Sequence, residues 1–132
     1  MIFSIYFFIY FWVETHTLTI SIQKIPSEKG KMMFAVYDSE KNYMNEKNAI
    51  AKKVAKIKNG KATVQFENLK AGKYAFVYFY DKNNDNTLNT NVLGIPTEKY
   101  GFSNKASGVF GPPSFQKSSF LINKNIEFLI DL

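Results

Sequence analysis

Residues 68–80 read NLKAGKYAFVYFY, a short turn followed by seven apolar or aromatic residues. The apolar run is rich in aromatic and branched side chains, which favours a strand at the centre of a sheet. Before it, Leu69, Gly72 and Tyr74 stand in the order common at the corner of immunoglobulin-like sandwiches, where the tyrosine hydroxyl bonds back to the backbone. The segment therefore predicts a central strand entered through a tyrosine corner.

Six further segments have the composition or alternation of strands: residues 17–25, 31–37, 49–58, 61–69, 115–122 and 125–132. Apolar spacing in 49–58 is imperfect, so a helix stays open there. Turn-forming residues 26–30 predict a hairpin between the first two strands, and Asn59-Gly60 predicts another through a type I′ turn. Seven short strands without periodic helices predict an all-β fold, an antiparallel β-sandwich of the immunoglobulin-like or transthyretin-like (prealbumin-like) kind.

The composition removes several classes of function. The 132-residue chain has no cysteine, which excludes disulfides, thiolate metal sites and cysteine nucleophiles. Its net charge of +6 comes from lysines alone, and without arginine for bidentate base or phosphate contacts we expect no nucleic-acid partner. The single histidine, His16, is expected at the surface and provides neither a catalytic triad nor a zinc site. We therefore expect no enzymatic activity.

The N-terminal segment differs in character from the rest. Residues 2–13 are apolar apart from Ser4 and two tyrosines, a length too short for the roughly 20 residues that span a bilayer but suited to a signal-peptide core. We expect residues 1–16 to be a signal-like leader or membrane anchor, and residues 17–132 to be one exported domain, periplasmic, extracellular or envelope-associated. No basic residue precedes the run and no small-x-small cleavage site follows it, so a buried strand is the alternative.

A long stretch, residues 81–114, is broken by glycine and proline and begins with DKNNDNTLNTN. Its oxygen-bearing side chains partly follow the spacing of a calcium loop. Position 6 is Asn86 instead of glycine, although asparagine can take the same left-handed conformation, and position 12 is Val92 instead of the bidentate glutamate. The pattern predicts a weak calcium site or, alternatively, a loop whose Asx turns satisfy its own backbone. The candidate ligands are Asp81, Asn83, Asp85, Asn89 and, through its backbone carbonyl, Thr87.

The second candidate site is the loop at residues 100–115, YGFSNKASGVFGPPSF. Its aromatic side chains are suited to recognising a protein, a glycan or an envelope component, unless they fold inward to cover the end of the sandwich. Both loops leave and re-enter adjoining strands, so they are expected at one end of the domain. The candidate ligand- or partner-binding residues are Tyr100, Phe102, Asn104, Phe110 and Phe115.

The ordered pieces LGIP, YGFSN and FGPPSF follow the central strand in one contiguous run. With these motifs, the chain from Leu18 to Leu132 resembles the uncharacterised bacterial domain-of-unknown-function family 2141 (DUF2141). The resemblance implies an exported domain with an immunoglobulin-like or prealbumin-like sandwich, and it implies no established activity. The chain departs from the family's aspartate-rich loop at Asn86, where glycine is usual.

Three functions remain open from the sequence. The first is an exported binding or accessory domain that engages a partner through residues 81–115, with calcium as a candidate cofactor and the leader as its only contact with a membrane. The second is a structural envelope domain without a ligand. The third is a small hydrolase on a transthyretin-like fold. It is disfavoured because such chemistry relies on histidine and arginine, and this chain has one histidine and no arginine.

Overall fold

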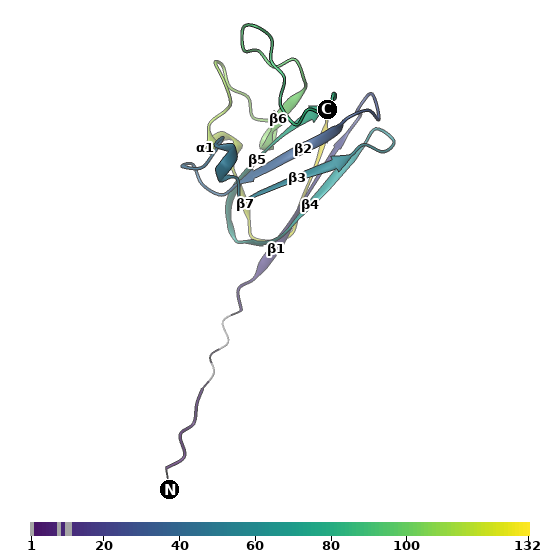
Figure 1. The fold of residues 1–132 in the computed structure, drawn as a ribbon. Helices are drawn as coiled ribbons and strands as arrows, with labels where there is room; N and C mark the ends of the chain where they lie inside the picture. Colours follow the sequence, from purple (N-terminus) through teal and green to yellow (C-terminus); the bar gives the residue numbers. More distant parts are fainter. Residues whose placement is uncertain (1, 8, 10–11) are drawn as a thin grey trace.

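Two β-sheets packed face to face make up the protein in the computed structural model, which describes residues 2–7, 9 and 12–132 (Figure 1). The smaller sheet has the order β4 (Ala62–Lys70), β1 (Thr15–Gln23) and β8 (Ile126–Asp131). The larger sheet has the order β3 (Ala51–Lys56), β2 (Lys31–Tyr37), β5 (Gly72–Asp81) and β6 (Tyr100–Phe102), and β7 (Phe120–Ile122) pairs with the start of β5. The described residues also form three short helices: η1 (Glu46–Asn48), η2 (Ser103–Lys105) and α1 (Phe115–Ser118). The predicted all-β sandwich is confirmed.

Alternation along the strands builds the core. In β4, Ala62, Val64 and Phe66 are buried, whereas the residues between them are exposed. The same pattern buries one face of β1 and of β2, and moving each large apolar side chain out of water contributes roughly 1.5–3 kcal/mol. The core residues from these two strands are Leu18, Ile20, Ile22, Met32, Phe34 and Val36.

Strand β5 is central, as its composition predicts. It pairs with β2 along one edge and with β7 and β6 along the other. The Tyr74 hydroxyl donates a hydrogen bond of 2.6 Å to the Lys70 carbonyl, so the tyrosine corner is confirmed. Phe76 contacts the rings of Phe120 and Phe128 at 5.7 and 5.1 Å, which joins the two sheets through an aromatic cluster.

The expected hairpin between residues 17–25 and 31–37 does not form. Strand β1 pairs with β4 and β8, whereas β2 lies in the opposite sheet, because the buried faces of the two strands must meet across the core. At Asn59-Gly60 both φ values are positive, 52° and 73°, and Lys58 and Lys61 exchange backbone hydrogen bonds of 2.9 and 3.0 Å. This tight turn matches the prediction, but the strands on either side of it also separate into different sheets.

Other details differ from the sequence-based expectation. The strand predicted at 49–58 forms over a shorter range as β3, and the helix left open there does not form. The expected strand 115–122 begins as helix α1, because the Ser114 hydroxyl caps it by accepting from the Lys117 N–H, and only β7 remains extended. Strand β6 is an addition inside the stretch expected to be irregular, which gives eight strands in the described chain. The β1–β8 pair is parallel rather than antiparallel.

Most of the leader lies outside the sandwich, and its last two residues, Thr15 and His16, belong to β1. Residues 2–7, 9 and 12–14 have no regular secondary structure and lead away from the domain (Figure 1), with Ile2 and Trp12 almost fully exposed, at 97% and 94%. Leader residues 1, 8, 10 and 11 lie outside the described residues. Strand β1 begins at Thr15, and His16 pairs with Leu69 and is buried, contrary to the expected surface position. In the described ranges, helices long and apolar enough for a transmembrane span are absent.

Replacing Tyr74 by phenylalanine tests the corner. Tyr74→Phe removes one hydrogen bond and preserves the ring, so the free energy of unfolding should fall by about 1 kcal/mol, as measured by urea denaturation. The matched control is Tyr100→Phe at a half-exposed position of β6, which should change stability by less than about 0.5 kcal/mol. Equal losses in the two variants would contradict a special role for the corner.

Candidate functional site

The acidic loop begins where β5 ends. Asp81 is fully buried, and its carboxylate accepts the N–H groups of Asp85 at 3.2 Å and Asn86 at 2.9 Å. The Lys31 ammonium lies 3.6 Å from Asp81 Oδ2 and also donates to Asn86 Oδ1. Asn86 has a φ of 63°, so asparagine does adopt the left-handed conformation expected of it. Backbone donors and a lysine thus make a buried carboxylate tolerable at this point.

Asp85 is the second carboxylate of the loop, and it is exposed. It accepts hydrogen bonds from the Asn89 amide at 2.7 Å, the Thr87 N–H at 3.0 Å and the Asn83 amide at 3.3 Å. These bonds, that of Asn89 foremost, hold the pKa of Asp85 below the ordinary value of 3.8 because they stabilise the ionised form. Asp85 therefore carries a negative charge at neutral pH.

A third carboxylate, Glu98, completes the cluster. Oxygens of Asp81, Asp85 and Glu98 all lie within 4.8 Å of one another. Glu98 also accepts the N–H groups of Lys82 and Asn89, each at 2.9 Å. Counting along a twelve-residue calcium loop misses Glu98, but the sequence holds a signal for it, since it is the first acidic residue after Asp85.

One oxygen beside the cluster has no partner. The Oδ1 atom of Asn89 is buried and makes no hydrogen bond within the described part of the chain, although the Asn89 amide nitrogen bonds to Asp85. Leaving a buried acceptor unpaired costs about 1–3 kcal/mol. Carboxylate and amide oxygens are ligands that calcium prefers. The residue set therefore suits a hard divalent cation.

The five candidate calcium ligands predicted from the sequence do not all belong to the carboxylate cluster. Asp81 and Asp85 belong to the carboxylate cluster, and Asn89 borders it. Asn83 and Thr87 contact Asp85 through an amide and a backbone N–H, as in an Asx-turn loop that satisfies its own backbone. The loop therefore combines a carboxylate cluster with Asx-turn hydrogen bonds.

Gly30, in the turn between β1 and β2, allows the close approach that forms this site. Its φ is +79°, and a Cβ atom there would lie 2.3 Å from the Asp81 carbonyl oxygen. Only glycine fits without moving the end of β5. The neighbouring Lys29 carbonyl accepts a 2.6 Å hydrogen bond from the Tyr80 hydroxyl, which fixes the turn against the same strand.

A small hairpin connects the acidic loop to β6. Thr97 N–H donates to the Asn89 carbonyl at 2.8 Å, and Asn91 N–H donates to the Ile95 carbonyl at the same distance. Asn89 and Glu98 flank the base of this hairpin, so the cluster and the hairpin are mechanically linked.

The aromatic candidates are divided by the structure. Phe102 is buried, and Phe115 is half-buried with its ring 5.6 Å from Tyr43, so for these two the inward alternative holds. The Asn104 amide donates to the Ser119 carbonyl at 2.7 Å and joins η2 to the segment before β7. Tyr100 is half exposed and Phe110 is fully exposed, which leaves these two aromatic side chains available to a partner.

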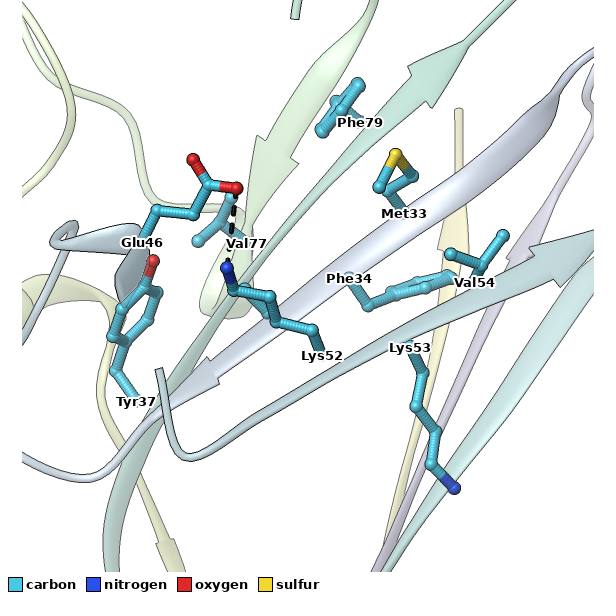
Figure 2. Close-up of a pocket in the computed structure, with 10 residues that line it drawn as sticks. Met33, Phe34, Tyr37, Glu46, Lys52, Lys53, Val54, Val77 and Phe79 are labelled. Carbon is cyan, nitrogen blue, oxygen red and sulfur yellow. Dashed lines mark hydrogen bonds and ion pairs between the residues drawn. The ribbon is translucent and has the colours of Figure 1, made fainter. Parts of the chain in front are cut away.

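Two hollows lie on the outer face of the larger sheet. One, of about 230 Å³, is lined by apolar side chains including Met33 and Val54, with an ion pair of 3.4 Å between Lys52 and Glu46 at its rim (Figure 2). The other, of about 250 Å³, lies where the two loops meet, as the sequence predicted for their positions. Its lining includes Val77, Phe79, Leu88, Pro96, Tyr100 and Pro112.

Comparison with curated proteins and with solved structures found no match to this chain. The model of the family described as "Uncharacterized protein conserved in bacteria (DUF2141)" matches residues 20–128, which include all strands of the sandwich in part or in whole. The family expected from LGIP, YGFSN and FGPPSF is thereby confirmed. The chain belongs to the DUF2141 family of uncharacterized proteins conserved in bacteria.

Proposed function

We propose that the protein is a non-enzymatic binding module that acts outside the cytoplasm, and that a calcium ion organises its binding end, residues 81–115. The observation that carries this proposal is the meeting of three carboxylates, those of Asp81, Asp85 and Glu98, beside the unpartnered oxygen of Asn89. Calcium would be held by these oxygens and would neutralise their mutual repulsion.

The separations agree with a single ion. Oxygens bound to one calcium ion at about 2.3–2.6 Å can be no more than about 5 Å apart. The carboxylate oxygens of the cluster meet this limit at 4.8 Å. Lys31 reduces the net charge of the cluster from three negative charges to two, which supports a weak rather than a tight site.

An extracytoplasmic location suits a weak site. Calcium sites of extracellular modules work with dissociation constants of about 10⁻⁴–10⁻³ M. The apolar leader, which lies outside the sandwich in its described part, supports export. The purely structural alternative is favoured by the inward packing of Phe102 and Phe115, but it does not account for the exposed Phe110.

The position of the histidine supports a non-enzymatic role. His16 pairs with Leu69 near the tyrosine corner, whereas Asp81 stands at the other end of β5. A hydrolase would need these groups in one cleft. Burial raises the pKa of Tyr78, which borders the loop cavity, so its hydroxyl stays neutral.

Thermal unfolding of the full chain tests calcium binding. Millimolar calcium should raise the midpoint relative to chelator, because a ligand at a hundred times its dissociation constant stabilises the folded state by about 2.7 kcal/mol. Glu98→Gln keeps the shape of the side chain but removes one ligand charge, and the calcium-induced rise should shrink or vanish. Glu127→Gln, on the exposed face of β8, is the control and should retain the full rise. An unchanged midpoint in the native protein would overturn the proposal.

The ammonium of Lys31 competes with a cation for Asp81. Lys31→Met removes that charge, so calcium affinity measured by titration calorimetry should rise roughly fivefold, the factor equivalent to about 1 kcal/mol of ion-pair energy. Stability in chelator should fall, because the buried carboxylate loses its partner. Lys56→Met, at the cross-strand neighbour on β3, should change the affinity by less than about twofold. Weaker binding in Lys31→Met would contradict a cation at this cluster.

A further inference from the structure

Two loop tips at the binding end carry large apolar side chains in full contact with water. The hairpin tip comprises residues 91–95, and the second tip comprises residues 108–111. Val92 and Phe110 are 102% exposed and Val109 is 86% exposed, so these side chains have almost no contact with the protein. Leu93 and Ile95 are also exposed. Several large apolar side chains exposed on two neighbouring loop tips are unusual for a surface that faces only water, and they indicate a site covered by a partner or a membrane.

We propose that the two tips insert into the surface of an anionic lipid membrane. This inference names the partner of the binding end and rests on the proposed function for the role of that end, but not for calcium. It adds a second membrane contact to the leader, which was the only one expected from the sequence.

The charge pattern of the loops fits this partner. Residues 86–97 and 106–116 contain no charged residue, in a chain of which 21% of residues are charged. Lys105 and Lys117 directly flank the second segment. The first segment is bounded by Asp85 and Glu98 of the carboxylate cluster, and Lys82 and Lys99 lie just outside them. All four lysines are exposed, so they can reach phosphate groups while the tips enter the acyl region.

Most N–H groups of the hairpin tip already have partners within the tip. Leu93 and Ile95 donate their N–H groups to the side-chain oxygen of Asn91, at 2.9 and 3.1 Å. Gly94 N–H donates to the Asn91 carbonyl at 2.9 Å. Because backbone groups without partners are costly in lipid, this pairing lowers the cost of entering the membrane interface.

The two tips lie at the same end of the domain. Gly94 and Pro96 from the hairpin and Gly111 and Pro112 from the second loop line one cavity. Figure 1 shows both loops rising from the end of the sandwich opposite to the leader. Their insertion is therefore a contact separate from that of the leader.

The isolated placement of the side chains favours lipid over a protein partner. A protein interface depends on a packed apolar core with matching shape. Val92, Val109 and Phe110 project singly and form no packed surface, whereas a fluid bilayer accepts such side chains without a matching shape.

A single tryptophan placed at the tip tests the proposal in the full chain. Trp12→Phe removes the natural tryptophan, and Phe110→Trp then supplies the only one. On vesicles of mixed anionic and zwitterionic lipid, its emission should shift to shorter wavelength and be quenched by brominated acyl chains. Leu121→Trp in the same background reports the leader end, because Leu121 on β7 pairs with Lys73 near the tyrosine corner. It should be quenched less than the tip probe.

Two sets of variants separate the apolar and charge contributions. Leu93→Ser with Val109→Ser should raise the vesicle concentration for half-maximal quenching by roughly tenfold or more. Lys99→Gln with Lys105→Gln should raise it by about fivefold per lysine. Leu129→Ser and Lys124→Gln, at exposed positions outside the loops, are the matched controls and should have little effect.

Three results would overturn the proposal. They are quenching of the Leu121→Trp probe without quenching at the tip, equal quenching of the tip by purely zwitterionic vesicles, and a concentration-dependent shift without vesicles, which would indicate a protein interface instead. Tip quenching should persist in chelator. If it does so while calcium fails to raise the unfolding midpoint, only the calcium proposal falls; if the midpoint rises but the tip is not quenched, only the lipid proposal falls.

Discussion

The pairing of β5 on both edges is the constraint on which both ends of the molecule depend. Its backbone bonds to β2 on one side and to β7 and β6 on the other, so the strand has little freedom to shift. The hydrogen bond from Tyr74 to the Lys70 carbonyl fixes the start of β5 to the end of β4. Phe76, which points inward, joins β5 to the opposite sheet through Phe128. The loop after Asp81 therefore starts from a rigid point, which is what a site built on loops requires.

Asp81 transmits that rigidity into the loop. Burying its carboxylate is tolerable because two backbone N–H groups and Lys31 surround it, and these contacts set the course of the next residues. The chain returns to the same point at Glu98, whose carboxylate accepts the Asn89 N–H and so holds the base of the hairpin. Charge and backbone order are thus coupled at one place, and the exposed apolar tips lie beyond it.

Local patterns made most of the strands predictable. Apolar and polar residues alternate in residues 62–66, and this pattern predicts a strand with one buried and one exposed face because the side-chain period of a strand is two. The partners of the strands were not predictable in the same way, because β1 and β2 could join one sheet or two with the same pattern. At α1 the Ser114 cap outweighed the strand-like composition of residues 115–122. The sequence analysis missed Glu98 because the twelve-residue calcium-loop pattern ends at Val92. Glu98 lies six residues further along, on the far side of a hairpin.

The sequence by itself determined what depends on neighbouring residues: the central strand, the tyrosine corner, the tight Asn59-Gly60 turn and the left-handed conformation of Asn86. Each follows from side-chain sterics or a bond within a few residues. Only the tertiary structure decided which sheet each strand joins, why Phe102 is buried and Phe110 exposed, and that Glu98 meets Asp81 and Asp85. These outcomes join residues far apart in the chain, so they depend on how the whole core packs.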